Sequence, residues 1–220
     1  FTLRRPRSPL PSPAACAAMV RRSSWEPRPE NRPANRRTPG RLRLGRSPDF
    51  DARWNAAYRP RITGRFAGTT DELIQWAACK WGLSDELLRA QAAAESSWRQ
   101  GAEGDLEPRS SGRCAPGDLR DPCPTSFGLL QVKWLFHRPG YPMVRTMSAF
   151  HLDWSAAQLR GCYDGRKRGL PGGDYWGCVG NWYSGDWRDP EALGYIARVR
   201  AELAGKPWLR WPGRAAGLRG

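Results

Sequence analysis

One glutamate in this 220-residue chain continues the apolar stripe of a predicted helix. Leu88, Ala92 and Glu95 follow one another at spacings of four and three residues, so they share one helical face. Burial against apolar surface disfavours the charged form of a carboxyl group and raises its pKa. A carboxyl that keeps its proton near neutral pH can donate it to a leaving alcohol. Glu95 is therefore a candidate general acid.

A simpler interpretation of Glu95 is a solvated side chain at a helix end. Arg99 lies four residues further on, at the spacing of an exposed ion pair worth about 0.3–0.5 kcal/mol. The segment 126–131, Ser-Phe-Gly-Leu-Leu-Gln, favours the catalytic interpretation. Gly128 permits close approach of the backbone to a ligand, and Gln131 offers a donor and an acceptor within an apolar run. The alternative for this segment is a short buried strand or turn with a satisfied amide.

The segments that must position these residues are predicted to form helices. Acidic residues follow Thr70 and Ser84, and Asp189 precedes a proline, which are signals for helix starts. Apolar spacings of three and four residues extend each helix. We expect helices over residues 70–81, 84 to about 98, 146 to about 163, and 189–205. Residues 99–125 read as a long polar loop, and no convincing run of alternating strands is present. The fold is predicted to be mainly α.

The positive charge is concentrated at the N-terminus. The chain has a formal net charge of +15, and residues 1–66 hold 16 arginines against four acidic residues. This segment is rich in proline and has no sustained period, which predicts a disordered basic extension over residues 1–66. We expect a domain over residues 67–207 and a C-terminal tail over residues 208–220. The near-neutral domain argues against a specific nucleic-acid-binding function.

Six cysteines allow fifteen full pairings, among which the sequence does not choose. Cys114 and Cys123 flank one loop that a disulfide could close, and Cys162 and Cys178 flank another. Cys79 reads as a small buried residue of a helix, and Cys16 lies in the extension. Because no Cys-x-x-Cys pair is present and only two histidines, His137 and His151, could assist, a metal site is not expected.

The order of four motifs resembles the transglycosylase domain of the soluble lytic transglycosylase and goose-type lysozyme group. Glu95-Ser96 matches the family's Glu-Ser pair at the end of a core helix, and residues 128–131 match its Gly-Leu-Met-Gln segment, with Leu for Met. Residues 181–185, Asn-Trp-Tyr-Ser-Gly, stand where the family has Ala-Tyr-Asn-x-Gly. Residues 195–199 resemble its closing Tyr-Val-x-x-Val helix. The resemblance covers roughly residues 68–205 and implies a lysozyme-like fold.

This resemblance implies cleavage of the β-1,4 link between N-acetylmuramic acid and N-acetylglucosamine in peptidoglycan, with Glu95 as general acid and then base. It implies no cofactor. Ser96 is expected to orient the carboxylate. The expected substrate contacts are Ser96, Ser126, Gly128, Gln131, Trp182, Tyr183 and Tyr195.

Two outcomes of the reaction stay open. Attack by the substrate's own C6 hydroxyl would make the enzyme a lytic transglycosylase, a lyase of glycan strands. Activation of water by Asp105, Asp153 or Asp186 would make it a hydrolytic muramidase. A glycan-binding module without catalysis is a third possibility, against which the retained Glu95 argues.

The expected partner is the peptidoglycan strand, bound by a monomer. Two loop disulfides would indicate an oxidising compartment, so we expect a secreted or cell-wall-associated protein, although no clear signal peptide is visible. No segment approaches the length of a transmembrane helix.

Overall fold

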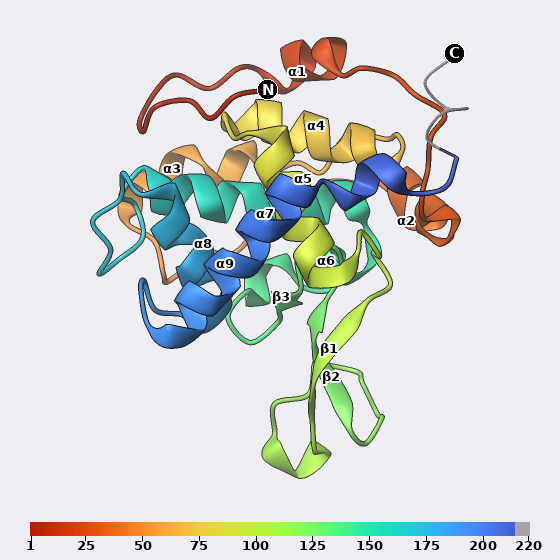
Figure 1. The fold of residues 1–220 in the computed structure, drawn as a ribbon. Helices are drawn as coiled ribbons and strands as arrows, with labels where there is room; N and C mark the ends of the chain where they lie inside the picture. Colours follow the sequence, from red (N-terminus) through yellow and green to blue (C-terminus); the bar gives the residue numbers. More distant parts are fainter. Residues whose placement is uncertain (214–220) are drawn as a thin grey trace.

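The computed structural model describes residues 1–213. Within these residues the longer helices form the body of the molecule (Figure 1): α4 (Thr70–Trp81), α5 (Asp85–Ser96), α7 (Ser148–Tyr163), α8 (Tyr175–Ser184) and α9 (Pro190–Gly205). All residues of α7 are buried, and α4, α6 and α8 pack against it. α5 packs against α4 and α9. The expectation of a mainly helical fold is confirmed at this level.

Shorter elements surround this body. The short α-helices are α1 (Pro13–Met19), α2 (Arg32–Arg36), α3 (Ala52–Ala57) and α6 (Met143–Thr146). Short 3₁₀ turns are formed by Pro29–Asn31, Arg59–Arg61, Arg109–Ser111, Arg138–Gly140 and Pro207–Arg210.

Side-chain caps explain where the longer helices begin. Ser84 caps α5 and Asp189 caps α9, each accepting a hydrogen bond from a backbone N–H of the first turn, as expected from the sequence. The cap of α4 is Thr69, one residue before the predicted Thr70. Its hydroxyl accepts from the backbone of Glu72, whose carboxylate accepts in return from the Thr69 N–H, which completes a capping box.

A small antiparallel sheet lies partly within residues 99–125, where the sequence predicted a long polar loop. β1 (Glu103–Glu107), β2 (Cys123–Phe127) and β3 (Val132–Lys133) pair in the order β1-β2-β3. The β1–β2 arm projects away from the helices (Figure 1) and contains the Cys114–Cys123 disulfide. β1 is rich in acidic residues, which have low strand propensity, so its extended form depends on pairing with the fully buried β2.

Residues 1–66 pack against the helical body, which differs from the expected disordered extension. In Figure 1 the segment begins beside α4 and passes through α1, α2 and α3. Trp25, Phe50 and Trp54 are buried in the core, and a disulfide joins Cys16 of α1 to Cys79 of α4. Trp25, Phe50 and Trp54 each stand between polar residues, so they create no period that a sequence analysis detects.

The two other disulfides join the pairs singled out from the sequence, Cys114–Cys123 and Cys162–Cys178.

The first residue of the predicted C-terminal tail is part of the folded body. Trp208 is buried and stacks on Trp98 at 6.1 Å between ring centroids. The rest of that predicted tail, residues 214–220, lies outside the described residues.

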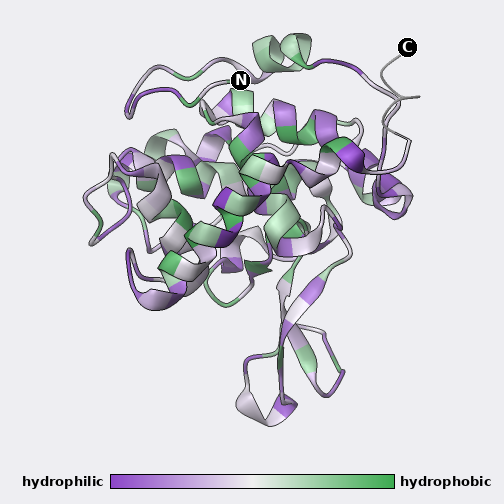
Figure 2. Cartoon of the chain, viewed as in Figure 1, coloured by the Kyte–Doolittle hydropathy of each residue, from purple (hydrophilic) through white to green (hydrophobic). Residues whose placement is uncertain are grey.

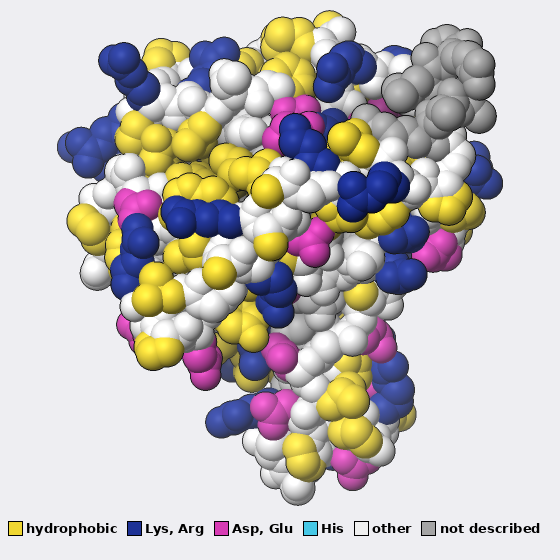
Figure 3. Space-filling view, viewed as in Figure 1, with side chains coloured by type: hydrophobic (Ala, Val, Ile, Leu, Met, Phe, Trp, Pro, Cys, Tyr) yellow, Lys and Arg dark blue, Asp and Glu magenta, His cyan; other side chains and the backbone are white. Residues whose placement is uncertain are grey.

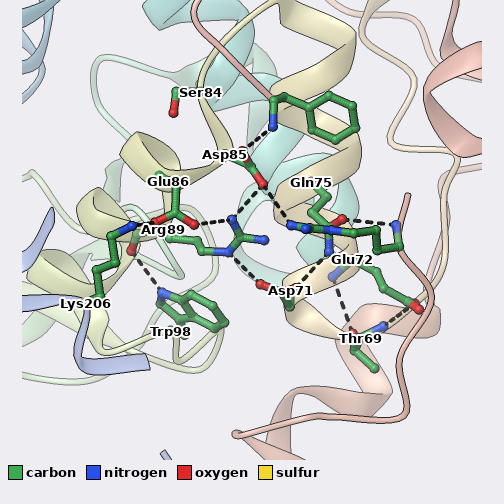
Figure 4. Close-up of polar contacts among 12 residues, drawn as sticks. Thr69, Asp71, Glu72, Gln75, Ser84, Asp85, Glu86, Arg89, Trp98 and Lys206 are labelled. Atoms are coloured by element: carbon green, nitrogen blue, oxygen red, sulfur yellow. Dashed lines mark hydrogen bonds and ion pairs between the residues drawn. The ribbon is translucent and has the colours of Figure 1, made fainter. Parts of the chain in front are cut away.

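A network of ion pairs fixes α5 against its neighbours (Figure 4). Arg89 of α5 is buried and pairs with Asp71 of α4 and with Asp85, both at 2.7 Å. Lys206, just after α9, pairs with Glu86 of α5 at 2.8 Å. The buried Arg89 pairs hold α5 against α4, whereas the Lys206–Glu86 pair is exposed and contributes little to the position of the helix.

Hydrophobic and hydrophilic residues are interspersed along the helices (Figure 2), and outer helices such as α9 bury one face. On the face drawn in Figure 3, Lys and Arg side chains are spread over the body with acidic side chains between them. No helix within residues 1–213 is long and apolar enough to cross a membrane.

Candidate active site

A cleft of about 900 Å³ runs between the sheet and the helical body. Its walls come from the three strands, from α5, α7, α8 and α9, and from residues 48–50 of the N-terminal segment. The predicted site residues that line it are Glu95, Ser126, Gln131, Trp182 and Tyr183. Ser96, Gly128 and Tyr195 are not among its lining residues.

Glu95 lies in the last turn of α5 and is half-buried. The hydroxyl of Tyr195 donates a hydrogen bond to its Oε1 at 2.6 Å. Burial raises the pKa of Glu95 to about 7, and the charge of Asp105 acts in the same direction. The Tyr195 hydrogen bond and the guanidinium of Arg198 act in the opposite direction. With this pKa the carboxyl is able both to donate and to accept a proton near neutral pH.

Tyr195 is itself held by a stack of side chains on α8 and α9. Its ring lies on that of Tyr183 at 4.7 Å between centroids, with 8° between the planes. The guanidinium of Arg198 lies 5.1 Å from the centroid of Tyr195 and 5.3 Å from that of Tyr183. Arg198 follows Tyr195 by three residues on α9, so the i, i+3 spacing was the signal in the sequence that could have identified it.

The predicted role of Ser96 differs from the one its contacts indicate. Its hydroxyl donates to the backbone carbonyl of Leu129 at 3.0 Å, with the carbonyl of Ala92 as the alternative acceptor at 3.3 Å, and it accepts from the backbone N–H of Arg99. No hydrogen bond between Ser96 and Glu95 is present within residues 1–213. Ser96 thus joins the end of α5 to the segment 128–131.

Gly128 serves packing. A Cβ at this position would lie 2.6 Å from Nδ1 of His151 and 2.8 Å from Nε2 of Gln100, and the residue has a φ of +78°. The neighbouring Leu130 N–H donates to Nε2 of His151, whose Nδ1 faces the carbonyl of Val144 at 2.7 Å. Burial lowers the pKa of His151 to about 4, so the ring is a neutral structural connection.

Gln131 presents its side chain to the cleft. Its Nε2 donates to the carbonyl of Gly128 at 2.9 Å, which fixes the amide. A Cβ on Gly104 of β1 would meet the Oε1 of Gln131, so glycine at this position leaves room for the amide in its present orientation.

Asp105 is the one carboxylate among the three water-activating candidates that lines the cleft. It accepts a hydrogen bond from Ser126 at 2.6 Å and pairs with Lys133 at 3.3 Å. Asp153 is fully buried and pairs with Lys80 at 2.6 Å, so it joins α7 to α4. Asp186 is not among the lining residues.

Aromatic side chains form another part of the wall. Trp182 donates from Nε1 to the carbonyl of Leu130 at 3.1 Å and stacks on His137 at 5.3 Å between centroids. Phe136 also lines the cleft and is 65% exposed. The sequence offered no periodic signal for Phe136 or His137, because both lie in an irregular segment.

Within residues 1–213, no group of three or more His, Cys, Asp or Glu side chains is arranged to hold a metal ion.

The comparisons with known proteins give no match, whether with protein-family models, with curated proteins or with solved structures.

Proposed function

We propose that the chain is a lysozyme-like enzyme that cleaves the glycan strand of peptidoglycan at the β-1,4 link between N-acetylmuramic acid and N-acetylglucosamine. The observation that carries this proposal is the Glu95 carboxyl, half-buried in a large cleft, bonded to Tyr195 and with its pKa raised to about 7. Exposed aromatic rings such as Phe136 and Tyr183 offer flat apolar surfaces against which sugar rings stack.

In the first step Glu95 protonates the glycosidic oxygen, the bond to the anomeric carbon breaks, and positive charge develops on the sugar ring. In the second step the ionised Glu95 takes the proton of the muramoyl C6 hydroxyl, whose oxygen bonds to the anomeric carbon. The product is an anhydromuramoyl end, and Glu95 is protonated again. The Tyr195 hydrogen bond stabilises the carboxylate between the two steps.

A hydrolytic muramidase is the second candidate. It is favoured by Asp105, which lines the same cleft and is held by Ser126 and Lys133. In this case Asp105 would take a proton from water as the oxygen attacks, and the product would carry a reducing end.

The test is digestion of purified peptidoglycan followed by mass spectrometry. The wild-type chain should release soluble products, and Glu95→Gln should release none, because the amide cannot donate the proton. Glu86→Gln is the matched control, since Glu86 lies on the same helix outside the cleft and should leave turnover intact. Anhydro ends would support the transglycosylase and reducing ends the hydrolase. Retained turnover by Glu95→Gln would refute the assignment.

The three disulfides are compatible with an extracellular location, because such bonds persist in oxidising compartments. We accordingly propose that the protein acts on the cell wall after secretion, as a monomer.

A further inference from the structure

We propose that Lys167, His137 and Asn181 form a subsite that binds a carboxylate of the stem peptide attached to the glycan. This inference rests on the proposed function and adds a substrate class to it, namely strands that carry acidic peptides. The three side chains line the same cleft as Glu95.

Lys167 is an ammonium group without a carboxylate partner. It is half-buried, and no Asp or Glu oxygen within residues 1–213 lies within 4.0 Å of its Nζ. Within residues 1–213 the ammonium donates one hydrogen bond, to Oδ1 of Asn181. An ammonium has three donors, so two of them are available to a molecule in the cleft. Burial lowers the pKa of Lys167, and an anionic ligand would offset this cost of desolvation.

The position of Lys167 is fixed by the backbone around it. Lys167 pairs with Phe50 in an isolated antiparallel bridge, and the N–H of Arg168 donates to the carbonyl of Asp49 at 2.9 Å. The partner amide is fixed as well, because Nδ2 of Asn181 donates to the carbonyl of Gly185. The ammonium is thus held in place before any ligand arrives, which lowers the entropic cost of binding.

His137 adds a neutral donor. Its Nδ1 accepts from the indole N–H of Trp154 at 3.3 Å, so in the neutral ring the proton is on Nε2. Burial, with a further effect of the Lys167 charge, lowers the pKa of His137 to about 3, which keeps the ring neutral. No hydrogen bond from Nε2 is made within residues 1–213. The stack on Trp182 holds the ring in this orientation.

The charges around the subsite fit a ligand with one negative charge. Lys133 of the same cleft is already paired with Asp105. Asp49 also lines the cleft, and its charge acts on Lys167 from beyond ion-pair distance. Two guanidinium groups line the cleft as well: Arg198 lies over Tyr183 and Tyr195, and Nε of Arg168 donates to the carbonyl of Phe50. An ammonium with an acid nearby suits a carboxylate better than a dianionic phosphate.

Two parts of peptidoglycan could supply that carboxylate. The repeating sugars are neutral when the lactyl group is in amide linkage, so in an intact strand the carboxylates belong to the stem peptide. In strands without peptide the lactyl group itself is a carboxylate. We commit to the stem peptide, because it is the source present in the intact polymer.

The test measures dissociation constants of soluble disaccharides for the full chain by calorimetry. Three ligands are compared: a disaccharide tetrapeptide with free carboxylates, the same compound with its carboxylates amidated, and the peptide-free disaccharide with its lactyl carboxylate. The wild-type chain should bind the free-carboxylate muropeptide about tenfold more tightly than the amidated one, the effect of one charge-assisted hydrogen bond.

Lys167→Met should remove this difference and Lys167→Arg should restore part of it. Asp49→Asn should strengthen binding of the free-carboxylate muropeptide, because a repelling charge is lost. Lys206→Met, outside the cleft, is the matched control and should change nothing. Thermal unfolding of each variant reports whether it is folded.

Two results would overturn the proposal: equal affinity of wild type for the free and amidated muropeptides, or a Lys167→Met effect confined to the lactyl carboxylate. These measurements need no turnover, so they are separate from the test of Glu95. If the enzyme cleaves strands but does not prefer the acidic muropeptide, the subsite proposal is refuted and the proposed function stands. If the chain binds the acidic muropeptide selectively but does not cleave strands, the proposed function is refuted and the subsite proposal stands.

Discussion

Replacement of Glu95 by Gln should change how the stability of the folded protein depends on pH. The pKa of Glu95 is about 7 in the folded protein, against 4.5 for an ordinary glutamate. Below about pH 4.5 the carboxyl is protonated in both the folded and the unfolded chain, so it causes no difference. Between about pH 4.5 and 7 the unfolded chain loses this proton first, which favours unfolding progressively. Above about pH 7 the loss is complete.

The magnitude follows from the two pKa values. Each unit of difference corresponds to about 1.4 kcal/mol, so the loss of stability reaches about 3 kcal/mol. Gln has no proton to lose and is not subject to this effect. The free energy of unfolding of Glu95→Gln, relative to wild type, should therefore rise by about 3 kcal/mol between about pH 4 and pH 8. The contributions of titrating groups that do not interact with Glu95 cancel in this difference.

The assay is denaturant unfolding followed by tryptophan fluorescence at several pH values. A difference between Glu95→Gln and wild type that stays constant from about pH 4 to pH 8 would mean that Glu95 ionises like a free side chain. The general-acid argument would then fail.

Three further predictions concern the surroundings of this carboxyl and the N-terminal segment. Tyr195→Phe removes the donor to Glu95, so it should raise the pKa of the carboxyl and shift the upper limb of the pH–activity profile to higher pH; an unshifted limb would contradict this role. Gly128→Ala should lower the free energy of unfolding by about 2–4 kcal/mol, measured by denaturation, because a Cβ would meet His151 at 2.6 Å and φ is +78°. Replacing Cys16 and Cys79 together by Ala should destabilise the chain by about 3–4 kcal/mol, and an unchanged melting temperature would show that the bond contributes nothing.

The sequence predicted well the parts of the fold that local signals determine. Caps and apolar spacing identify α5 and α9, and the same spacing places Glu95 on the face of α5 that meets the cleft. The pairs Cys114–Cys123 and Cys162–Cys178 each close a short loop, so proximity in the chain was enough to suggest them.

The parts that were missed depend on contacts between distant residues. β1 is formed by pairing with β2, and α8 contains Gly177 and Gly180, which lower its helix propensity. Trp25 and Trp54 are buried by partners far along the chain. Lys167 and His137 are in irregular segments, where no periodicity reveals that they face the cleft.

The N-terminal segment has a practical consequence for dissecting this protein. Residues 48–50 form part of the cleft wall, and Trp25 and Phe66 cover apolar side chains of the body, with Phe66 stacked on Trp76 of α4. Truncation at residue 67 would remove that wall and leave tryptophans of α4 open to water, a patch of the kind that drives aggregation. Catalytic competence should accordingly be lost on shortening the chain, even though every proposed proton-transfer group would remain.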